Sequence, residues 1–379
     1  DLRLDLRACN ASRSAVRREV ERRWIACGWN YPVAANWHDG ITDNHGMTSV
    51  LTDSVPATTL LAFSLWPLQG PEASVLAKAD LPHLRKWLTQ SQRVEVHLDP
   101  VKEPLLATLS PPHERAWAQA MGWSCVDGAL PWAARAAAEQ GLSGNGWAFI
   151  SLCNWHVSNG QVTLGDPAHL QLDAATDAAL FQAMQGFFAE DGIVLHPHKP
   201  GHWLAQSPLL NDLLTASLDR VIGRNIDPWL VGCEAADGAL TPGAKLLRRL
   251  QNEMQMLLYT HPVNEGRSLT INSFWVHGTG CLSAAQVASP EPAMVHVLRQ
   301  PALQQDLMGW LDAWQHVDAH VIAPILTRVK AGVPQRLILC GEHAFHVYDS
   351  AAPAWWQRLR TYVAPSSLDA VLAVAPLKD

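Results

Sequence analysis

Apolar residues recur along most of the chain in two spacings, separated by short polar stretches that are rich in Pro and Gly. Continuous apolar runs between chain-breaking residues predict buried strands. These runs lie at residues 58–66, 271–278, 336–343 and 368–376. Apolar residues three and four positions apart predict helices, at residues 81–90, 109–122, 176–192, 208–223, 243–260 and 305–332. Because strands and helices alternate, the pattern predicts an α/β fold with a mostly parallel sheet flanked by helices.

The middle of the chain has a different pattern. Between residues 146 and 166, apolar and polar positions alternate on both sides of Asn159 and Gly160, a dipeptide typical of tight hairpins. We therefore expect residues 125–210 to form an inserted, smaller α+β part. The main α/β core is then expected to comprise residues 47–124 and 211–379.

Residues 1–46 show no sustained helical or strand period and contain seven arginines but no lysine. From Met47 onward the sequence resembles an ordinary protein start. The hypothesis is that translation normally begins at Met47, and that residues 1–46 are a disordered or non-native extension. The alternative is an arginine-rich N-terminal arm with a helix near residues 14–24.

Composition excludes several classes of protein. Hydrophobic residues make up 48% of the 379 residues and charged residues 17%, which suits a sizeable core and not a disordered chain. The net charge of -7 leaves no basic excess, which argues against nucleic-acid binding. No apolar run approaches the ~18 residues that span a bilayer. The seven cysteines are scattered without a CxxC pair, and the first residues lack the order of a secretion signal, so we expect a cytoplasmic protein.

Polar residues follow the predicted strand at 336–343. Ligands bind at the carboxyl ends of strands in open α/β sheets, so Glu342, His343 and His346 are candidate site residues. A carboxylate with imidazoles suits a divalent metal or acid–base chemistry. The alternative is a surface loop that contains two histidines.

Three arginines are candidates for an anion clamp, because a planar guanidinium can hold a phosphate or carboxylate with two hydrogen bonds. They are Arg220, Arg224 and Arg267. The alternative is that Arg220 and Arg224, four residues apart on a helix, remain solvated. The chain has no GxSxG elbow, no GxxxxGK[ST] loop and no GxGxxG turn after a strand, so the mechanisms tied to these motifs are poorly supported.

Residues 261–280, HPVNEGRSLTINSFWVHGTG, resemble a motif of the archaeal-type, cofactor-independent phosphoglycerate mutases. Members of that family have His-Pro-x-Asn, an Arg, an Asn and a closing Gly-x-Gly in similar order. The matching residues here are His261, Pro262, Asn264, Arg267, Asn272, Gly278 and Gly280. The resemblance implies an alkaline-phosphatase-like α/β fold with a two-metal phosphoryl-transfer site. It also implies that the four polar residues of the motif contact a small phosphorylated sugar acid.

Other segments resemble the same family in the same order along the chain. They include TTLLAFSLWPL for the first strand, SPPHERAWAQAMG for a helix start and LILCGEHAF for a late strand. Three further segments, LSPPHERA, TASLDRVIGRNID and LLRRLQNEMQMLLYTHPVN, resemble bacterial proteins described as phosphoglycerate-mutase-like.

The positions that perform the chemistry in that family differ here. Ser64 stands where the first strand should end in a metal-binding Asp, and His113 matches the position of the nucleophilic serine. Glu342 and His343 match an Asp-His pair, and Asp318 lies in the segment that resembles the late Asp-bearing helix. Because a two-metal site needs its full set of ligands, the resemblance implies at most one divalent ion (Mn, Mg or Zn).

Three functions remain open from the sequence. The first is a phosphoglycerate mutase or phosphohydrolase with a rearranged site, in which His113 accepts the phosphate. The second is a catalytically silent protein that binds a small phosphorylated metabolite. The third is a scaffold without a ligand. The sequence does not predict an oligomeric state.

Overall fold

The computed structural model describes residues 57–67, 79–99, 108–123, 126–158, 160–232, 240–282, 291–350 and 371–374. The chain divides into two compact units, Asp1–Asp53 and Ser54–Asp379, and every described residue belongs to the second. The extension expected at residues 1–46 therefore lies outside the described residues. None of the described helices is long and apolar enough to cross a membrane.

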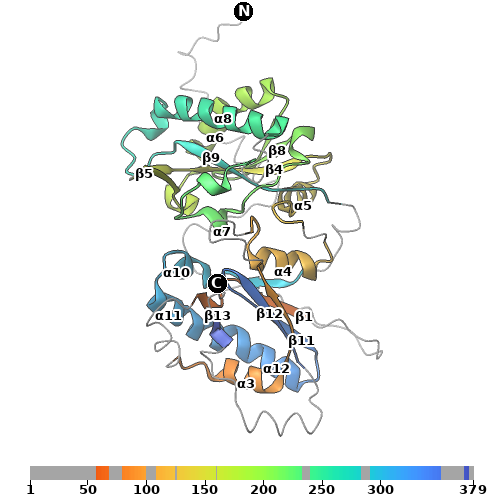
Figure 1. Cartoon of the computed structure of the whole chain (residues 1–379). Helices are drawn as coiled ribbons and strands as arrows, with labels where there is room; N and C mark the ends of the chain where they lie inside the picture. The colour runs from red at the N-terminus through yellow and green to blue at the C-terminus, as the bar shows by residue number, and fades with distance from the viewer. Residues whose placement is uncertain are drawn as a thin grey trace, which may run out of the picture. The chain divides into compact units, whose positions relative to one another are not determined.

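One sheet of this unit has five strands in the order β10-β1-β11-β12-β3. Figure 1 labels β1, β11 and β12 of this sheet. Its strands are β1 (Ala57–Leu61), β3 (Gln92–Leu98), β10 (Ala293–Val295), β11 (Gln335–Cys340) and β12 (Ala344–Asp349). β1 pairs in parallel with β10 and β11, whereas β11–β12 and β12–β3 are antiparallel. The predicted α/β class is confirmed. The sheet is mixed rather than mostly parallel, because β11 returns through a short turn into β12.

Helices cover both faces of the first sheet. They are α3 (Pro82–Gln90), α4 (Pro112–Ala120), α10 (Arg299–Leu303), α11 (Leu307–Val317) and α12 (Ala323–Lys330), with a π-helical turn at Asp318–Ile322. Side chains alternate along β1, so that Leu61 packs with Trp87 and Trp310 on one face. Leu60 packs with Trp117 of α4 on the other face. Two minor strands, β2 (Trp66–Pro67) and β13 (Ala373–Val374), pair in parallel.

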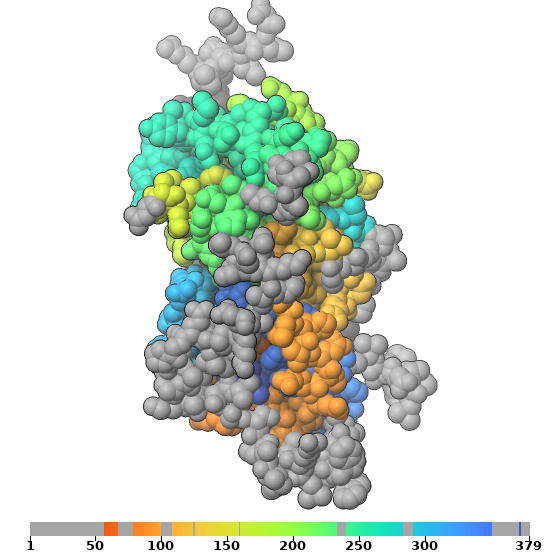
Figure 2. Space-filling model, viewed as in Figure 1, coloured from red at the N-terminus to blue at the C-terminus, as the bar shows by residue number. Residues whose placement is uncertain are grey.

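A second, antiparallel sheet has the strand order β7-β8-β4-β9. Its strands are β4 (Trp147–Cys153), β7 (Val194–Lys199), β8 (His202–Gln206) and β9 (Ser273–Gly280). The helices α6 (Ala174–Glu190) and α8 (Pro242–Tyr259) pack on one face, and α5 (Trp132–Glu139) packs on the other. Figure 2 shows α8 in teal at the protein surface. The hairpin predicted around residue 160 is present as β5 (Trp155–Ser158) and β6 (Gln161–Leu164).

This second sheet takes β9 and α8 from outside the insertion predicted at residues 125–210. β9 pairs with β4 along its length, and Leu250 and Met254 of α8 pack in the same core as Phe274 of β9. Without β9, the second edge of β4 would be unpaired. The remaining short elements are α7 (Leu218–Val221) and 3₁₀ turns at Pro167–Leu170, Pro208–Leu210, Asp227–Trp229 and Pro262–Asn264.

Candidate functional site

A cavity of about 490 Å³ lies at the carboxyl ends of β1 and β11. Its lining includes Phe63 and Trp66 after β1, Glu342 after β11, and Asp219 and Arg224 from the segment around α7. Because β1, β10 and β11 are parallel, their carboxyl ends meet at one edge of the sheet, where ligands bind in open α/β sheets. The cavity is therefore the candidate functional site.

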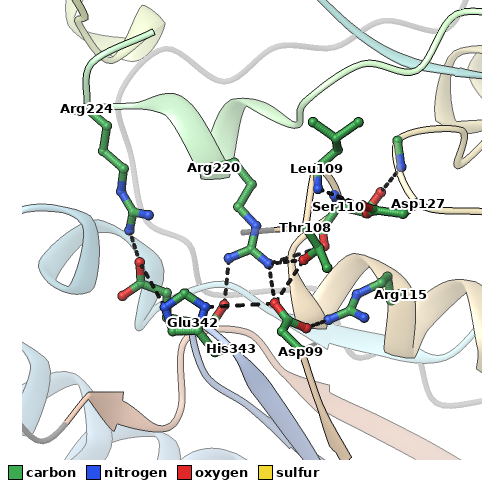
Figure 3. A network of polar contacts seen from close by, with 11 residues as sticks. Asp99, Thr108, Leu109, Ser110, Arg115, Asp127, Arg220, Arg224, Glu342 and His343 are labelled. Atoms are coloured by element: carbon green, nitrogen blue, oxygen red, sulfur yellow. Dashed lines mark hydrogen bonds and ion pairs between the residues drawn. The ribbon is translucent and has the colours of Figure 1, made fainter. Parts of the chain in front are cut away.

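The main chain of the turn between β11 and β12 is held by hydrogen bonds, one within the turn and two from other parts of the chain; Figure 3 shows Arg220 beside Glu342 and His343 of this turn. Gly341 N–H donates to the carbonyl of Ala344 at 2.7 Å. The carbonyl of Glu342 accepts from Arg220 Nη1 at 2.6 Å, and the carbonyl of His343 accepts from Asp99 N–H at 2.7 Å. The turn thus holds Glu342 at the cavity with little freedom in its main chain.

Arg220 is buried, with 1% of its surface exposed, and its guanidinium is bound by the protein itself. Nη2 donates to Asp99 Oδ2 at 2.8 Å and to Thr108 Oγ1 at 2.6 Å, and Asp99 also pairs with Arg115. Burial lowers the pKa of Arg220 to about 10, so it remains charged at neutral pH. A buried charge is tolerated only when it is paired, and these contacts supply the pairing. Arg220 therefore joins the β11–β12 turn to Asp99.

Arg224 is the more accessible arginine at the cavity. Its guanidinium forms an ion pair with the Glu342 carboxylate, and the two side chains are 38% and 27% exposed. His343 Nε2 lies 3.8 Å from the same carboxylate oxygen. Burial lowers the pKa of His343 below its usual range, although the Glu342 charge opposes this shift.

His113 lies in the first turn of α4 and is 2% exposed. Its Nε2 is 3.1 Å from Asp219 Oδ2, and Arg299 Nε donates to Asp219 Oδ1 at 2.8 Å. Burial alone would raise the pKa of Asp219, but the His113 hydrogen bond and the Arg299 charge outweigh it and hold that pKa well below its usual range. The ionised carboxylate accepts a hydrogen bond from His113 Nε2–H, and in the neutral form of the ring the lone pair then lies on Nδ1.

The free nitrogen of His113 has no hydrogen-bond partner among the described residues. Its ring packs against Phe63, which lines the cavity, at 5.0 Å between centroids. An oriented imidazole with a free lone pair is the arrangement of a general base or nucleophile. The burial of His113 limits its access to a ligand.

Several partners at this site were not found from the sequence. Asp99, Asp219, His296 and Arg299 were not predicted, although His296 directly follows β10 and Arg299 begins α10. That strand has only three residues, too few to show a period of two. Burial lowers the pKa of His296 below its usual range, so the imidazole is held neutral beside the Asp219 cluster.

The residues suggested as metal ligands are not brought together as a metal site. Asp318 accepts from the backbone N–H groups of His83 and Leu84 at 3.1 and 2.6 Å, and so caps α3. Ser64 donates to the Leu61 carbonyl at 2.9 Å and accepts from Cys340 N–H at 2.8 Å. Within the described part of the chain, no group of three or more His, Cys, Asp or Glu could hold a metal ion. With Glu342 occupied by Arg224, the donor set does not fit the divalent ion that the resemblance implies.

The polar residues of the 261–280 motif bind backbone groups near their own loop. Asn264 exchanges two hydrogen bonds of 2.8 Å with the main chain of Ile271, and Asn272 exchanges two with Trp155 at 2.7 and 2.9 Å. Arg267 donates to the Leu170 carbonyl, and His261 accepts from Val263 N–H at 3.2 Å. None of these four residues lines the cavity. The structure brings Arg220, Arg224, Glu342 and His343 together. It places His113 beside Asp219 and Phe63, which line the cavity, and the motif residues elsewhere.

A second polar cluster lies on the other sheet. Ser151 Oγ is 2.7 Å from His202 Nδ1 and 2.8 Å from His277 Nε2, which links β8, β4 and β9. Burial lowers the pKa of His202 to about 4 and that of His277 to about 3. Both imidazoles are therefore neutral at physiological pH.

No protein-family model and no curated protein sequence matches this chain. Among solved structures, it is similar to the cofactor-independent phosphoglycerate mutase from Thermoplasma acidophilum DSM 1728, with 11% identity and a TM-score of 0.37 over 85% of this chain and 96% of that one. It is also similar to the PH0037 protein from Pyrococcus horikoshii, with 13% identity and a TM-score of 0.37 over 78% of this chain and 87% of that one. Similarity at this level establishes neither a shared fold nor a shared activity.

Proposed function

We propose that this chain is a phosphoglycerate-mutase-like protein that binds a small phosphorylated sugar acid in the 490 Å³ cavity without a two-metal site. The observation that supports the proposal is Arg224, a partly exposed guanidinium in the wall of a cavity at the carboxyl ends of parallel strands. An arginine in such a place suits a phosphate or carboxylate. The sequence resemblance supplies the substrate class.

The side chains that would have to bind metals favour ligand binding over two-metal phosphoryl transfer. Two metals would have to neutralise the attacking and leaving oxygens, which requires several free carboxylates and imidazoles. Here Glu342 is paired with Arg224, and Ser64 and Asp318 bind backbone groups. Each of these groups already has a structural partner.

The arrangement of His113 supports a second candidate, metal-independent phosphoryl transfer through Nδ1. Asp219 orients the ring, and Phe63, against which the ring packs, reaches the cavity. In this step the Nδ1–P bond forms as the P–O ester bond of phosphoglycerate breaks, and glycerate leaves with a proton taken up from water. The candidate therefore requires a phosphohistidine, detected as acid-labile phosphate after incubation with labelled phosphoglycerate. Label that is absent from the parent protein, or that persists in His113→Ala, rules it out.

Calorimetry with 3-phosphoglycerate in EDTA tests the binding proposal. We expect the parent protein to bind, and Arg224→Gln to bind at least about tenfold more weakly, because a charge-assisted contact is worth roughly 1.5–3 kcal/mol. Arg336→Gln is the matched control, because Arg336 is 34% exposed and pairs with Asp349 at the opposite end of β11. Absence of binding, or equal losses in both variants, contradicts the proposal.

A further inference from the structure

Glu342 and Arg224 both line the cavity and form an ion pair with each other. We propose that Glu342 is an internal carboxylate competitor for Arg224, and that the cavity selects ligands whose dianionic phosphate replaces it. This inference rests on the proposed function and specifies the ligand class of the same site.

The hydrogen bonds of the turn confine any movement to the Glu342 side chain. Arg220 Nη1 donates to the Glu342 carbonyl at 2.6 Å, and Asp99 N–H donates to the next carbonyl, that of His343, at 2.7 Å. The side chain itself is 27% exposed and bound by one guanidinium. The carboxylate can therefore leave Arg224 without any change in the main chain.

A nearby group can receive the released carboxylate. His343 Nε2 is 3.8 Å from Glu342 Oε1, so a small side-chain rotation brings the two within hydrogen-bond distance. The Glu342 carboxylate that leaves Arg224 can thus bind His343 and water instead. When the Glu342 carboxylate leaves Arg224, it does not become a buried charge without a partner, which would carry a large desolvation cost.

Arg224 is distinguished from the other cations at this site by its exchangeable partner. Arg220 is held by the buried Asp99, and Arg299 is held by Asp219. Electrostatic attraction scales with the product of the charges. A carboxylate ligand carries the same single charge as Glu342, so replacing Glu342 with it hardly changes the electrostatic attraction to Arg224. A phosphate monoester is a dianion above its second pKa near 6, so replacing Glu342 with it strengthens that attraction.

Calorimetry at pH 8 with glycerol 3-phosphate and glycerate tests the inference. In the parent protein we expect binding of glycerol 3-phosphate and no measurable binding of glycerate at the same concentrations. Glu342→Gln keeps the backbone carbonyl that Arg220 holds. It should tighten glycerol 3-phosphate about tenfold, which equals about 1.4 kcal/mol, and bring glycerate into the measurable range.

Asp349→Asn is the matched control, because the Arg336–Asp349 pair has side-chain exposures of 34% and 28%, close to those of Arg224 and Glu342. It should leave both affinities unchanged. If Glu342→Gln weakens binding or leaves it unchanged while Arg224→Gln abolishes it, the competitor role is wrong and the proposed function stands. If neither the parent nor Glu342→Gln binds either probe, the inference fails, and the proposed function fails with it only when the parent does not bind 3-phosphoglycerate either.

Discussion

At the scale of single residues, the site is built from charges paired between distant parts of the chain. The sequence suggested Glu342 and His343 because they follow a predicted strand, and Arg220 and Arg224 because guanidinium groups can clamp an anion. His113 was suggested by the family resemblance. The sequence did not predict Asp99 or Asp219. Asp99 pairs with Arg220, 121 positions away, and Asp219 pairs with Arg299, 80 positions away. A single sequence holds no local pattern for such pairs.

Asp219→Asn tests the importance of this pairing for stability. The carboxylate is 11% exposed and serves both His113 and Arg299, so its loss leaves a largely buried guanidinium without its counter-charge. We expect the free energy of unfolding in urea to fall by about 3 kcal/mol. Asp212→Asn, at an exposed position, should change it by less than about 0.5 kcal/mol. Similar values for the two variants would contradict the account.

At the scale of elements, polar side chains that suggested chemistry often close turns and helix ends. Asp318 caps α3, and a π-helical turn at Asp318–Ile322 precedes Pro324, which lacks the N–H that a regular helix would use there. Asn264 and Asn272 secure the loop between α8 and β9. A sequence motif identifies such residues but does not distinguish a ligand contact from a backbone contact.

Asn264→Ala separates these two roles. Its amide makes hydrogen bonds to the Leu258 carbonyl and to both backbone groups of Ile271, so we expect a loss of about 1–3 kcal/mol in the free energy of unfolding. The affinity for 3-phosphoglycerate should not change. Asn252→Ala, at an exposed position on α8, is the control and should alter neither quantity. Weaker binding without loss of stability would instead establish a substrate contact.

At the scale of the whole molecule, the α/β class followed from alternating periods, but the arrangement of strands did not. The run at 271–278 predicted a strand and gave no indication that it pairs with β4 rather than with β1 or β11. Strand partners are chosen by long-range packing, and both sheets bury similar apolar side chains. The sequence analysis also did not predict the strand β12 at Ala344–Asp349, which pairs with β11 and β3.

Burial of histidines throughout the described unit predicts sensitivity to acid. Burial lowers the pKa of six histidines below the ordinary 6.5, namely His198, His202, His277, His296, His343 and His346. Below pH 6.5 these histidines bind protons in the unfolded chain but stay neutral in the folded chain. The free energy of unfolding is therefore highest above pH 6.5 and falls as the pH falls toward 4. Urea denaturation from pH 8 to 4 should show this decline.

A matched pair of variants checks the cause of the decline. His277→Gln should make the free energy of unfolding depend less on pH between 6.5 and 4. The variant lacks one imidazole whose pKa differs between the folded and unfolded states. His320→Gln, at an exposed position, should leave the curve unchanged. An unfolding free energy that is flat from pH 8 to 4 in the parent protein would show that these imidazoles are not held neutral.

The cavity is proposed to hold a phosphorylated ligand at Arg224 without a metal. Crystals of the protein soaked with 3-phosphoglycerate in EDTA would show where the phosphate lies. We expect phosphate oxygens within hydrogen-bond distance of the Arg224 guanidinium, with the Glu342 carboxylate turned away from it. Phosphate bound at Arg267 in the loop between α8 and β9, or a cavity that stays empty at saturating ligand, would contradict it.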